Sequence, residues 1–451
     1  MKAVLISTYD MGRQPFGVAS AAAWLHRAGC DVSCVDLAKE PLPETTAASA
    51  DLVGLYLPMH TATRLAAPVI AKLRQLNRSA RICAFGLYAP LNESWLRSLG
   101  VEAVFGGEFE ADLARFATNS SASPLAAAPP GASCGRRIPR LQFLVPDRST
   151  LPPLTQYATL QQADGSRRAV GYTEASRGCK HLCRHCPIVP IYGGQFRIVD
   201  PAVVAGDVDA QVRAGARHIT FGDPDFFNGP KHAMRVVERL RAVHPDVTYD
   251  VTIKIEHLLK HRGLLPRLAA TGCAFVTTAV ESIDDAVLVI LQKGHTRADF
   301  IRAVDLCRDA GLTLAPTFVA FHPWLTLRGY CDLLDTIEEL DLVDEVAPIQ
   351  LAIRLLLPAG SRLVTVEAMS RHLEEFDPET LMYRWTHPDP RVDALHGEVT
   401  ALVGARLKAD RRVVFDEISR LAHDRAGVSR RASRPWRSRA SVPYLNEPWY
   451  C

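Results

Sequence analysis

Three closely spaced cysteines that follow a buried strand place the strongest constraint on this chain. Cys179, Cys183 and Cys186 form a Cys-x3-Cys-x2-Cys array, and the apolar residues 169–173 shortly before it are typical of a strand. Gly178 lets the chain turn into a loop at the start of the array. Three thiolates on one tight loop can hold three corners of a cubane iron–sulfur cluster. The array therefore predicts a 4Fe–4S site whose fourth iron has no protein ligand and is open to a small molecule.

The same array also admits a zinc site, because His181 and His185 lie inside it and could complete four ligands. Structural zinc sites usually use two pairs of ligands separated by a longer insert. No second Cys/His pair appears nearby in the sequence. We therefore favour the cluster, and a zinc-holding binding protein with a degenerate barrel is the alternative.

The composition is that of an ordinary globular protein, with 48% hydrophobic and 22% charged residues in a chain of 451. The net charge of +3 gives no reason to expect nucleic acid as a partner. No apolar run has the length of a membrane span, and the first residues are typical of a strand and not of a secretion signal. Eleven cysteines without such a signal favour a reducing compartment. We expect a cytoplasmic protein whose cysteines are thiols, with no membrane partner.

Residues 1–118 alternate short apolar segments with helical patterns. The segments expected to be strands are 3–7, 31–36, 52–57, 81–85 and 103–105. This alternation predicts an α/β fold with a doubly wound parallel sheet, which binds ligands beyond the carboxyl ends of its strands. Residues 119–154 are rich in small residues and proline and predict a linker.

The alternation resumes in residues 155–361. Here the segments expected to be strands are 169–173, 218–221, 248–255, 274–282, 313–320 and 349–356. They predict a partial six-stranded β/α barrel with its site at the carboxyl ends of the strands. Residues 362–427 have helical periodicity and predict a helical cap on the barrel, and residues 428–451 form a basic tail with a terminal cysteine.

The cysteine array after a strand resembles that of the radical S-adenosylmethionine (SAM) superfamily. The resemblance implies an enzyme in which Cys179, Cys183 and Cys186 hold the cluster, while the open iron chelates the amino and carboxylate groups of SAM. An electron from the cluster then cleaves SAM to a 5′-deoxyadenosyl radical, which abstracts hydrogen from a substrate. The resemblance also implies a reductant protein, such as a flavodoxin or ferredoxin. It leaves open which small molecule or peptide is the substrate.

Further motifs at strand ends match positions that hold SAM in this superfamily. Gly222 and Asp223 match a Gly-Gly-Glu-like turn that binds the SAM amino group, although the same turn could be a plain helix N-cap. Glu281 and Ser282 match a Glu-Ser pair that faces SAM. His185 stands where the family usually has a larger aromatic residue, and it could stack on adenine in the same way.

Three more side chains are candidates for contact with substrate or cofactor. His322 and Trp324 stand where relatives have a Gly-x-Pro-Gly turn, so they either line a reshaped substrate pocket or form a buried aromatic plug. Arg354 lies in an apolar segment and needs an anionic partner. That partner is either a structural carboxylate or the carboxylate of SAM or substrate. For Lys293, in a Lys-Gly-His-Thr turn typical of the family, a direct role and a structural one both stay open.

The N-terminal sheet resembles the cobalamin-binding-like domain that precedes many radical SAM domains. The resemblance rests on residues 51–56 and on the Gly-Glu-x-Glu motif that contains Glu108 and Glu110. The family motif Asp-x-His-x-x-Gly supplies a histidine ligand to cobalt, and residues 9–13, Tyr-Asp-Met-Gly-Arg, lack it. We expect a cobalamin-free sheet that covers the substrate side of the barrel. The alternative is a cobalamin-dependent radical SAM methyltransferase.

The chain closes with an apolar, aromatic segment that ends in Trp-Tyr-Cys at Cys451. This ending resembles the CUAEP/CCAEP-tail radical SAM proteins, in which a cysteine is followed by selenocysteine or cysteine and then by Ala-Glu-Pro. We hypothesise that a UGA codon for selenocysteine follows Cys451, which would make the two residues a redox pair. A natural terminus or a plain truncation is the other explanation. A thiol or selenol redox protein that works through Cys451 is the last alternative function.

Overall fold

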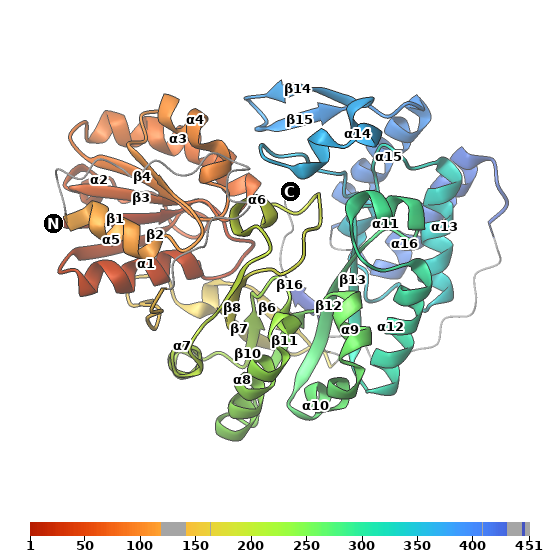
Figure 1. The fold of residues 1–451 in the computed structure, drawn as a ribbon, viewed down its shortest axis with the longest axis horizontal. Coiled ribbons are helices and arrows are strands. Elements are labelled where there is room, and N and C mark those ends of the chain that lie inside the picture. Colours follow the sequence, from red (N-terminus) through yellow and green to blue (C-terminus); the bar gives the residue numbers. More distant parts are fainter. Residues whose placement is uncertain (119–140, 163, 408, 431–443, 447–451) are drawn as a thin grey trace.

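A computed structural model describes residues 1–118, 141–162, 164–407, 409–430 and 444–446 (Figure 1). Most of the predicted linker, most of the predicted basic tail and Cys451 lie outside the described residues. None of the helices in the described ranges is long and apolar enough to cross a bilayer.

The N-terminal part of the chain is a five-stranded sheet with the order β2-β1-β3-β4-β5, and every neighbouring pair is parallel. The strands are β1 (Lys2–Ser7), β2 (Asp31–Asp36), β3 (Leu52–Tyr56), β4 (Arg81–Phe85) and β5 (Ala103–Phe105). They are largely buried, as expected of apolar strands covered on both faces.

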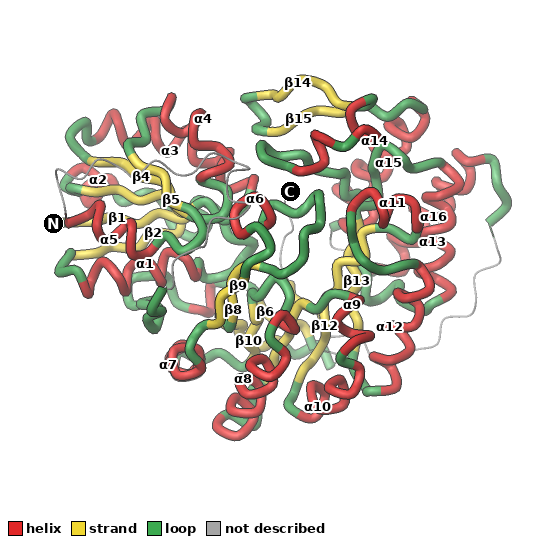
Figure 2. The backbone as a smooth tube through the Cα atoms, viewed as in Figure 1, coloured by secondary structure: helices red, strands yellow, loops and turns green. Residues whose placement is uncertain are grey.

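Helices cover both faces of this sheet (Figure 2). One apolar core joins the sheet to α1 (Phe16–Arg27) and α5 (Glu110–Thr118). A second core, on the other face, joins it to α2 (Glu44–Ala48), α3 (His60–Leu76) and α4 (Glu93–Ser98), with the short 3-10 helix η1 (Pro90–Asn92) before α4. The predicted doubly wound α/β sheet is therefore confirmed.

The second sheet has the order β13-β12-β11-β10-β7-β6-β16. The five strands from β7 to β13 run parallel: β7 (Arg167–Thr173), β10 (His218–Phe221), β11 (Thr248–Thr252), β12 (Cys273–Glu281) and β13 (Thr313–Phe318). Two short antiparallel strands, β6 (Thr159–Gln161) and β16 (Tyr444–Asn446), extend the β7 edge. This is the predicted partial barrel, with two edge strands that sequence patterns did not indicate.

Helices pack around the parallel strands and share one large apolar core with them. They are α7 (Pro201–Arg213), α8 (Pro230–Val243), α9 (Ile255–Lys260), α10 (Leu265–Ala270), α12 (Arg297–Asp309) and α13 (Leu327–Glu339), with the 3-10 helices η2 (Leu154–Gln156), η3 (Phe226–Asn228) and η4 (Arg262–Leu264). Helix α11 (Asp285–Leu291) belongs instead to a smaller apolar core with Leu355 and Leu357. A separate antiparallel pair, β8 (Ser176–Gly178) and β9 (Phe196–Ile198), encloses the cysteine loop and the short helix α6 (Val189–Tyr192).

The sixth strand that we predicted at 349–356 is reduced to a single bridge between Phe321 and Arg354. The apolar run begins instead as a 3-10 helix, η5 (Pro348–Leu351), which proline favours at its first position. The side chain of Gln350 accepts a hydrogen bond from the backbone N–H of Phe318 at 3.2 Å. An amide side chain thus takes the place of a strand neighbour at this point of β13.

The C-terminal region is also less helical than predicted. The 3-10 helix η6 (Arg362–Thr365) and α14 (Glu367–Ser370) lead into an antiparallel hairpin of β14 (Leu373–Asp377) and β15 (Met382–Trp385), and only then come α15 (Pro390–Ala405) and α16 (Arg411–Ala426). The hairpin forms because Tyr383 and Trp385 pack with Leu355 and Leu357 in a small apolar core of their own. Such a contact between distant segments has no local sequence signal.

Trp385 anchors this hairpin, so we expect Trp385→Ala to lower the free energy of unfolding by about 3 kcal/mol. Trp385 is 6% exposed, and its Nε1 donates to the carbonyl of Leu355 at 2.9 Å. Truncation of the side chain would leave this carbonyl oxygen without its partner. Denaturant titration measures the change. Val289→Ala is the control, because Val289 is 73% exposed on α11. Equal small effects of both substitutions would contradict the anchoring role.

Candidate active site

The three cysteines lie in a loop whose base is the β8–β9 pair. Ser176, Arg177 and Gly178 on one strand face Ile198, Arg197 and Phe196 on the other. Gly178 has a φ of +73°, and a Cβ atom there would lie 2.5 Å from the carbonyl oxygen of Gln195. Only glycine fits this entry to the loop without moving the opposite strand.

The loop gathers the three thiols into one buried place. Cys179 and Cys183 are buried and Cys186 is half-buried, and all three are free thiols. Burial, with a smaller contribution from the nearby thiols of Cys183 and Cys179, raises the pKa of Cys186 to about 12. The backbone N–H of Cys186 also donates to the carbonyl of Cys183 at 3.3 Å, which brings these two residues together in the loop. A cubane cluster needs this donor set, and binding as thiolates would relieve the cost that burial imposes on them.

Glu281 connects the end of β12 to the cysteine loop. Its backbone has a φ of +68°, where the register between β12 and β13 shifts. One carboxylate oxygen lies 3.0 Å from Nε2 of His185 and 3.3 Å from Nζ of Lys293. Burial acts to raise the pKa of Glu281, but Lys293 and His185 outweigh it and lower the pKa to about 2. The structure thus brings Glu281 and His185 together and adds Lys293 as their charged partner.

Asp223 is occupied by the chain itself. Its carboxylate accepts hydrogen bonds from the hydroxyl of Ser176 at 2.5 Å and from the N–H of Ala175 at 2.9 Å. Burial raises the pKa of Asp223 to about 7 despite these bonds. Asp223 therefore fixes the chain just before the cysteine loop. Gly222 beside it is needed because a Cβ atom there would lie 1.7 Å from the hydroxyl of Tyr172.

His322 and Trp324 do not line either of the two cavities described below. Their rings lie 5.7 Å apart, and Nε1 of Trp324 donates to the carbonyl of Ala368. Burial lowers the pKa of His322 to about 4, so this ring is neutral at physiological pH. His322 is buried and Trp324 is half-buried, so the two rings pack against other parts of the chain. Ser282 accepts the N–H of Asp284 in the turn before α11.

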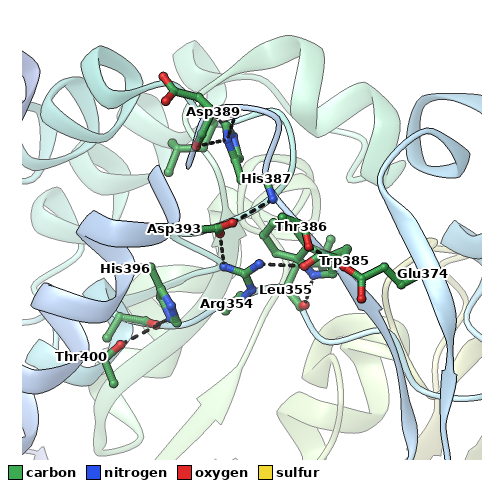
Figure 3. Close-up of polar contacts among 12 residues, drawn as sticks. Arg354, Leu355, Glu374, Trp385, Thr386, His387, Asp389, Asp393, His396 and Thr400 are labelled. Atoms are coloured by element: carbon green, nitrogen blue, oxygen red, sulfur yellow. Dashed lines mark hydrogen bonds and ion pairs between the residues drawn. The ribbon is translucent and has the colours of Figure 1, made fainter. Parts of the chain in front are cut away.

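Figure 3 shows that Arg354 has a structural partner. Its guanidinium lies 2.6 Å from Asp393 and donates to the carbonyl of Trp385 at 2.8 Å, while its carbon atom sits 3.6 Å above the Trp385 ring. Asp393 also accepts the N–H of His387. Of the two partners that we expected for Arg354, the structure supplies the structural carboxylate.

Two adjoining cavities lie at the carboxyl ends of the strands. The first, of about 900 Å³ including space open to solvent, lies between the N-terminal sheet and the cysteine loop. The second, of about 1220 Å³ on the same measure, lies inside the barrel. Both are lined by Met11, Arg13, Ile188, Gly222 and Pro224. The two cavities therefore adjoin at these residues, between the domain boundary and the interior of the barrel.

One buried arginine joins the two sheets beside the first cavity. Arg177, at the start of the cysteine loop, lies 2.6 Å from Glu110, 2.7 Å from Glu174 and 3.7 Å from Glu108. Glu110 also accepts the hydroxyl of Ser20. Sequence reasoning noted the Glu-x-Glu motif but not its partner, because Arg177 lies in a different part of the chain. The sequence signal that could have identified this partner is the arginine just before the cysteine array.

Comparison with known proteins gives a family match for the part of the chain around this site. Residues 173–339 match the family model described as the radical SAM superfamily. A bacteriochlorophyllide d C-8(2)-methyltransferase of Chlorobaculum tepidum is 24% identical over 212 residues, which are 44% of this chain and 44% of that protein. The chain spans less than half the length of the curated relatives it matches first.

Solved structures resemble a larger part of the chain. The cobalamin-dependent SAM radical enzyme OxsB with aqua-cobalamin bound superimposes with a TM-score of 0.70 at 14% identity, covering 94% of this chain and 72% of its own. The radical SAM methyltransferase TsrM from Kitasatospora setae, with cobalamin and a 4Fe–4S cluster bound, has a TM-score of 0.61 at 18% identity. The match covers 75% of this chain and 73% of TsrM. At these identities the likeness concerns the fold, which the two sheets share.

The carboxyl group of Glu108 makes the stability of the domain contact depend on pH. Burial raises its pKa from 4.5 to about 7, against the influence of Arg177. The folded state therefore binds the proton of the Glu108 carboxyl group more tightly than the unfolded state does. The stability that this protonated group contributes is complete below pH 4.5 and is lost as the pH rises to about 7. We expect Glu108→Gln to lose less thermal stability than the native chain over this range. Glu367→Gln, at a side chain that is 89% exposed, is the control. Parallel curves for the native chain and Glu108→Gln would contradict the assignment.

Proposed function

From the premise that residues 173–339 form a radical SAM domain, we propose that this chain cleaves SAM reductively and activates a C–H bond of a substrate in the barrel. Cys179, Cys183 and Cys186 would hold the cluster. When bound, the cluster supplies the electron that splits SAM into methionine and a 5′-deoxyadenosyl radical, which takes one hydrogen atom from the substrate and leaves as 5′-deoxyadenosine.

The observation that carries this proposal is the position of the cysteine loop beside the two cavities. Two neighbours of Cys186 support it, since Ile188 lines both cavities and His185 contacts Glu281 at the end of β12. A loop in this place sets its cofactor at the carboxyl ends of the strands, where ligands of β/α barrels bind.

The residues matched to SAM contacts fall into two groups. Gly222 lines both cavities and brings the backbone close to a ligand, and Ser282 and Glu281 end β12 on the same side of the barrel. Asp223 and Glu281 already have partners in the chain, so we propose that they act on SAM mainly by positioning the loop, with one lone pair left for the ligand. His185, held by Glu281, is the proposed adenine contact.

The barrel cavity offers polar contacts without a strong net charge. Thr220, Thr252, Thr277 and Thr317 line its wall, together with Asp250. His218 and Thr220 already hold one oxygen of Asp250 at 2.9 and 2.6 Å. A wall of hydroxyl groups suits a polar small molecule or a peptide segment. The N-terminal sheet, tied down through Arg177, would shield the radical from water.

We also propose a flavodoxin or ferredoxin as the electron donor and the cytoplasm as the location. All nine described cysteines are free thiols, which supports a reducing compartment.

The test is formation of 5′-deoxyadenosine. Protein purified without oxygen, reconstituted with iron and sulfide and given SAM and dithionite, should release 5′-deoxyadenosine, measured by chromatography with mass detection. Cys183→Ala should abolish it, while Cys331→Ala, at a buried cysteine outside the loop, should retain it. Zinc in place of iron, with no 5′-deoxyadenosine, would overturn the proposal and support the zinc-site alternative.

A second candidate is a cobalamin-dependent methyltransferase, which the first cavity favours. This cavity lies where cobalamin-binding-like domains place ligands, because residues that follow β1, β3, β4 and β5 line it: Asp10, Pro58, Gly86 and Gly107. The two cobalamin-bound structures above resemble 94% and 75% of this chain, which supports this candidate.

The residues at this edge fit a corrin only without a protein ligand to cobalt. The histidine at this edge, His60, is held by the carbonyl of Thr380 at 2.6 Å. The ring of Tyr56 packs over Gly17, where a Cβ atom would lie 2.2 Å from it, and contacts Phe85. Tyr56 and Gly17 both line the first cavity, so this ring takes up part of the space that a corrin would need.

We therefore expect the purified chain to retain no cobalamin after anaerobic incubation with hydroxocobalamin and gel filtration. The corrin absorption in the visible range measures retention, with albumin of equal concentration as the blank. One equivalent of retained corrin would contradict this expectation and make methyl transfer the favoured reaction.

A further inference from the structure

A second group of metal-ligating side chains lies beside the cysteine loop. It joins His181 of that loop, Asp225 after β10 and His257 on α9, so three separate segments contribute one side chain each. Oδ2 of Asp225 lies 3.2 Å from Nε2 of His181 and 2.6 Å from Nδ1 of His257. Asp225 is fully buried and His257 is 7% exposed.

Both histidine nitrogens lie at ion-pair distance from Oδ2 of Asp225, yet these three atoms have no hydrogen bond of normal geometry. Nε2 of His181, Oδ2 of Asp225 and Nδ1 of His257 are all buried without a hydrogen-bond partner. Buried polar atoms without partners are rare and costly, so this cluster calls for a ligand that satisfies all three.

The surrounding contacts hold the donors in place. Oδ1 of Asp225 accepts the backbone N–H groups of Phe227 and Lys254, which leaves Oδ2 directed at the two imidazoles. Nδ1 of His181 lies 3.6 Å from a carboxylate oxygen of Glu256. A carboxylate on the far nitrogen of a histidine is the usual outer contact of a metal-bound imidazole.

We propose that His181, Asp225 and His257 bind one divalent transition-metal ion, such as Zn²⁺ or Fe²⁺, separate from the cluster. Two imidazoles and one carboxylate are the donor set of catalytic zinc sites and of mononuclear iron sites, and they leave positions open for water or substrate. Donors at roughly 2 Å from one ion lie roughly 3 Å apart, which is close to the two distances found here.

The proposal assigns Cys179 to the cluster and not to this ion. Its sulfur, one nitrogen of His181 and one oxygen of Asp225 all lie within 4.8 Å of one another. A single site of Cys179, His181 and Asp225 is therefore the competing arrangement. In that case ion and cluster would exclude each other, whereas the two sites proposed here fill together.

Co²⁺ is the probe, because its visible absorption reports the ligands. The reconstituted full chain is titrated with Co²⁺, and cobalt, iron and sulfide are counted after desalting. We expect one bound Co²⁺ in addition to the cluster, without a sulfur-to-cobalt charge-transfer band. His257→Gln and Asp225→Asn should each raise the dissociation constant by more than about 100-fold, and Glu256→Gln by about tenfold.

Two further variants separate the sites. His261→Gln is the matched control. The ring of His261 lies 5.6 Å from that of His257, one helical turn further on, but His261 is not one of the three donors. The affinity of this variant for Co²⁺ should therefore be unchanged. Cys179→Ala should lose the cluster and keep the Co²⁺. Loss of Co²⁺ from Cys179→Ala, retention in His257→Gln, or no binding by the native chain would each overturn the proposal. None of these results depends on 5′-deoxyadenosine, so failure here is distinguishable from failure of SAM cleavage.

Discussion

The buried guanidinium of Arg177 is the contact on which the arrangement of the two sheets depends. Its carboxylate neighbours come from both sides, Glu174 from the barrel and Glu108 and Glu110 from the N-terminal sheet. Burial opposes its charge, but these carboxylates outweigh burial and raise the pKa of Arg177 well above its usual value. Removing one member of a buried set of charges leaves the others uncompensated. The first residues of the cysteine loop and the N-terminal sheet are therefore held as one unit.

The same loop is fixed at two other points, each by a carboxylate at the end of a barrel strand. Asp223 after β10 holds Ala175 and Ser176 before the loop, and Glu281 at the end of β12 holds His185 within it. The backbone N–H of Arg184 adds a bond to the carbonyl of Leu291. A cluster ligand loop must present its three thiols in one geometry before the metal arrives, and these contacts lower the entropy cost of that order.

Local patterns in the sequence were enough for the parallel strands and the cysteine loop, because each depends on a short apolar run or a fixed spacing. They were not enough where a distant partner decides the structure. The run after Pro348 is as apolar as a strand, but the side chain of Gln350 takes the neighbouring hydrogen bond of β13. The hairpin of β14 and β15 exists because Trp385 has a place to pack. Likewise, the chemistry of Asp223 and Arg354 was readable, but their partners Ser176 and Asp393 were not.

Parallel topology also explains why chemistry-bearing side chains gather at one edge of the barrel. Strands that run in the same direction end at the same edge, so residues that follow β10 and β11 become neighbours although they are far apart in the chain. Asp225 and His257 meet in this way, and the cysteine loop, which follows β7, brings His181 to them. The sulfur of Cys179 lies within 4.8 Å of the donor atoms of His181 and Asp225, so the cluster and the proposed second ion would be close neighbours on one loop.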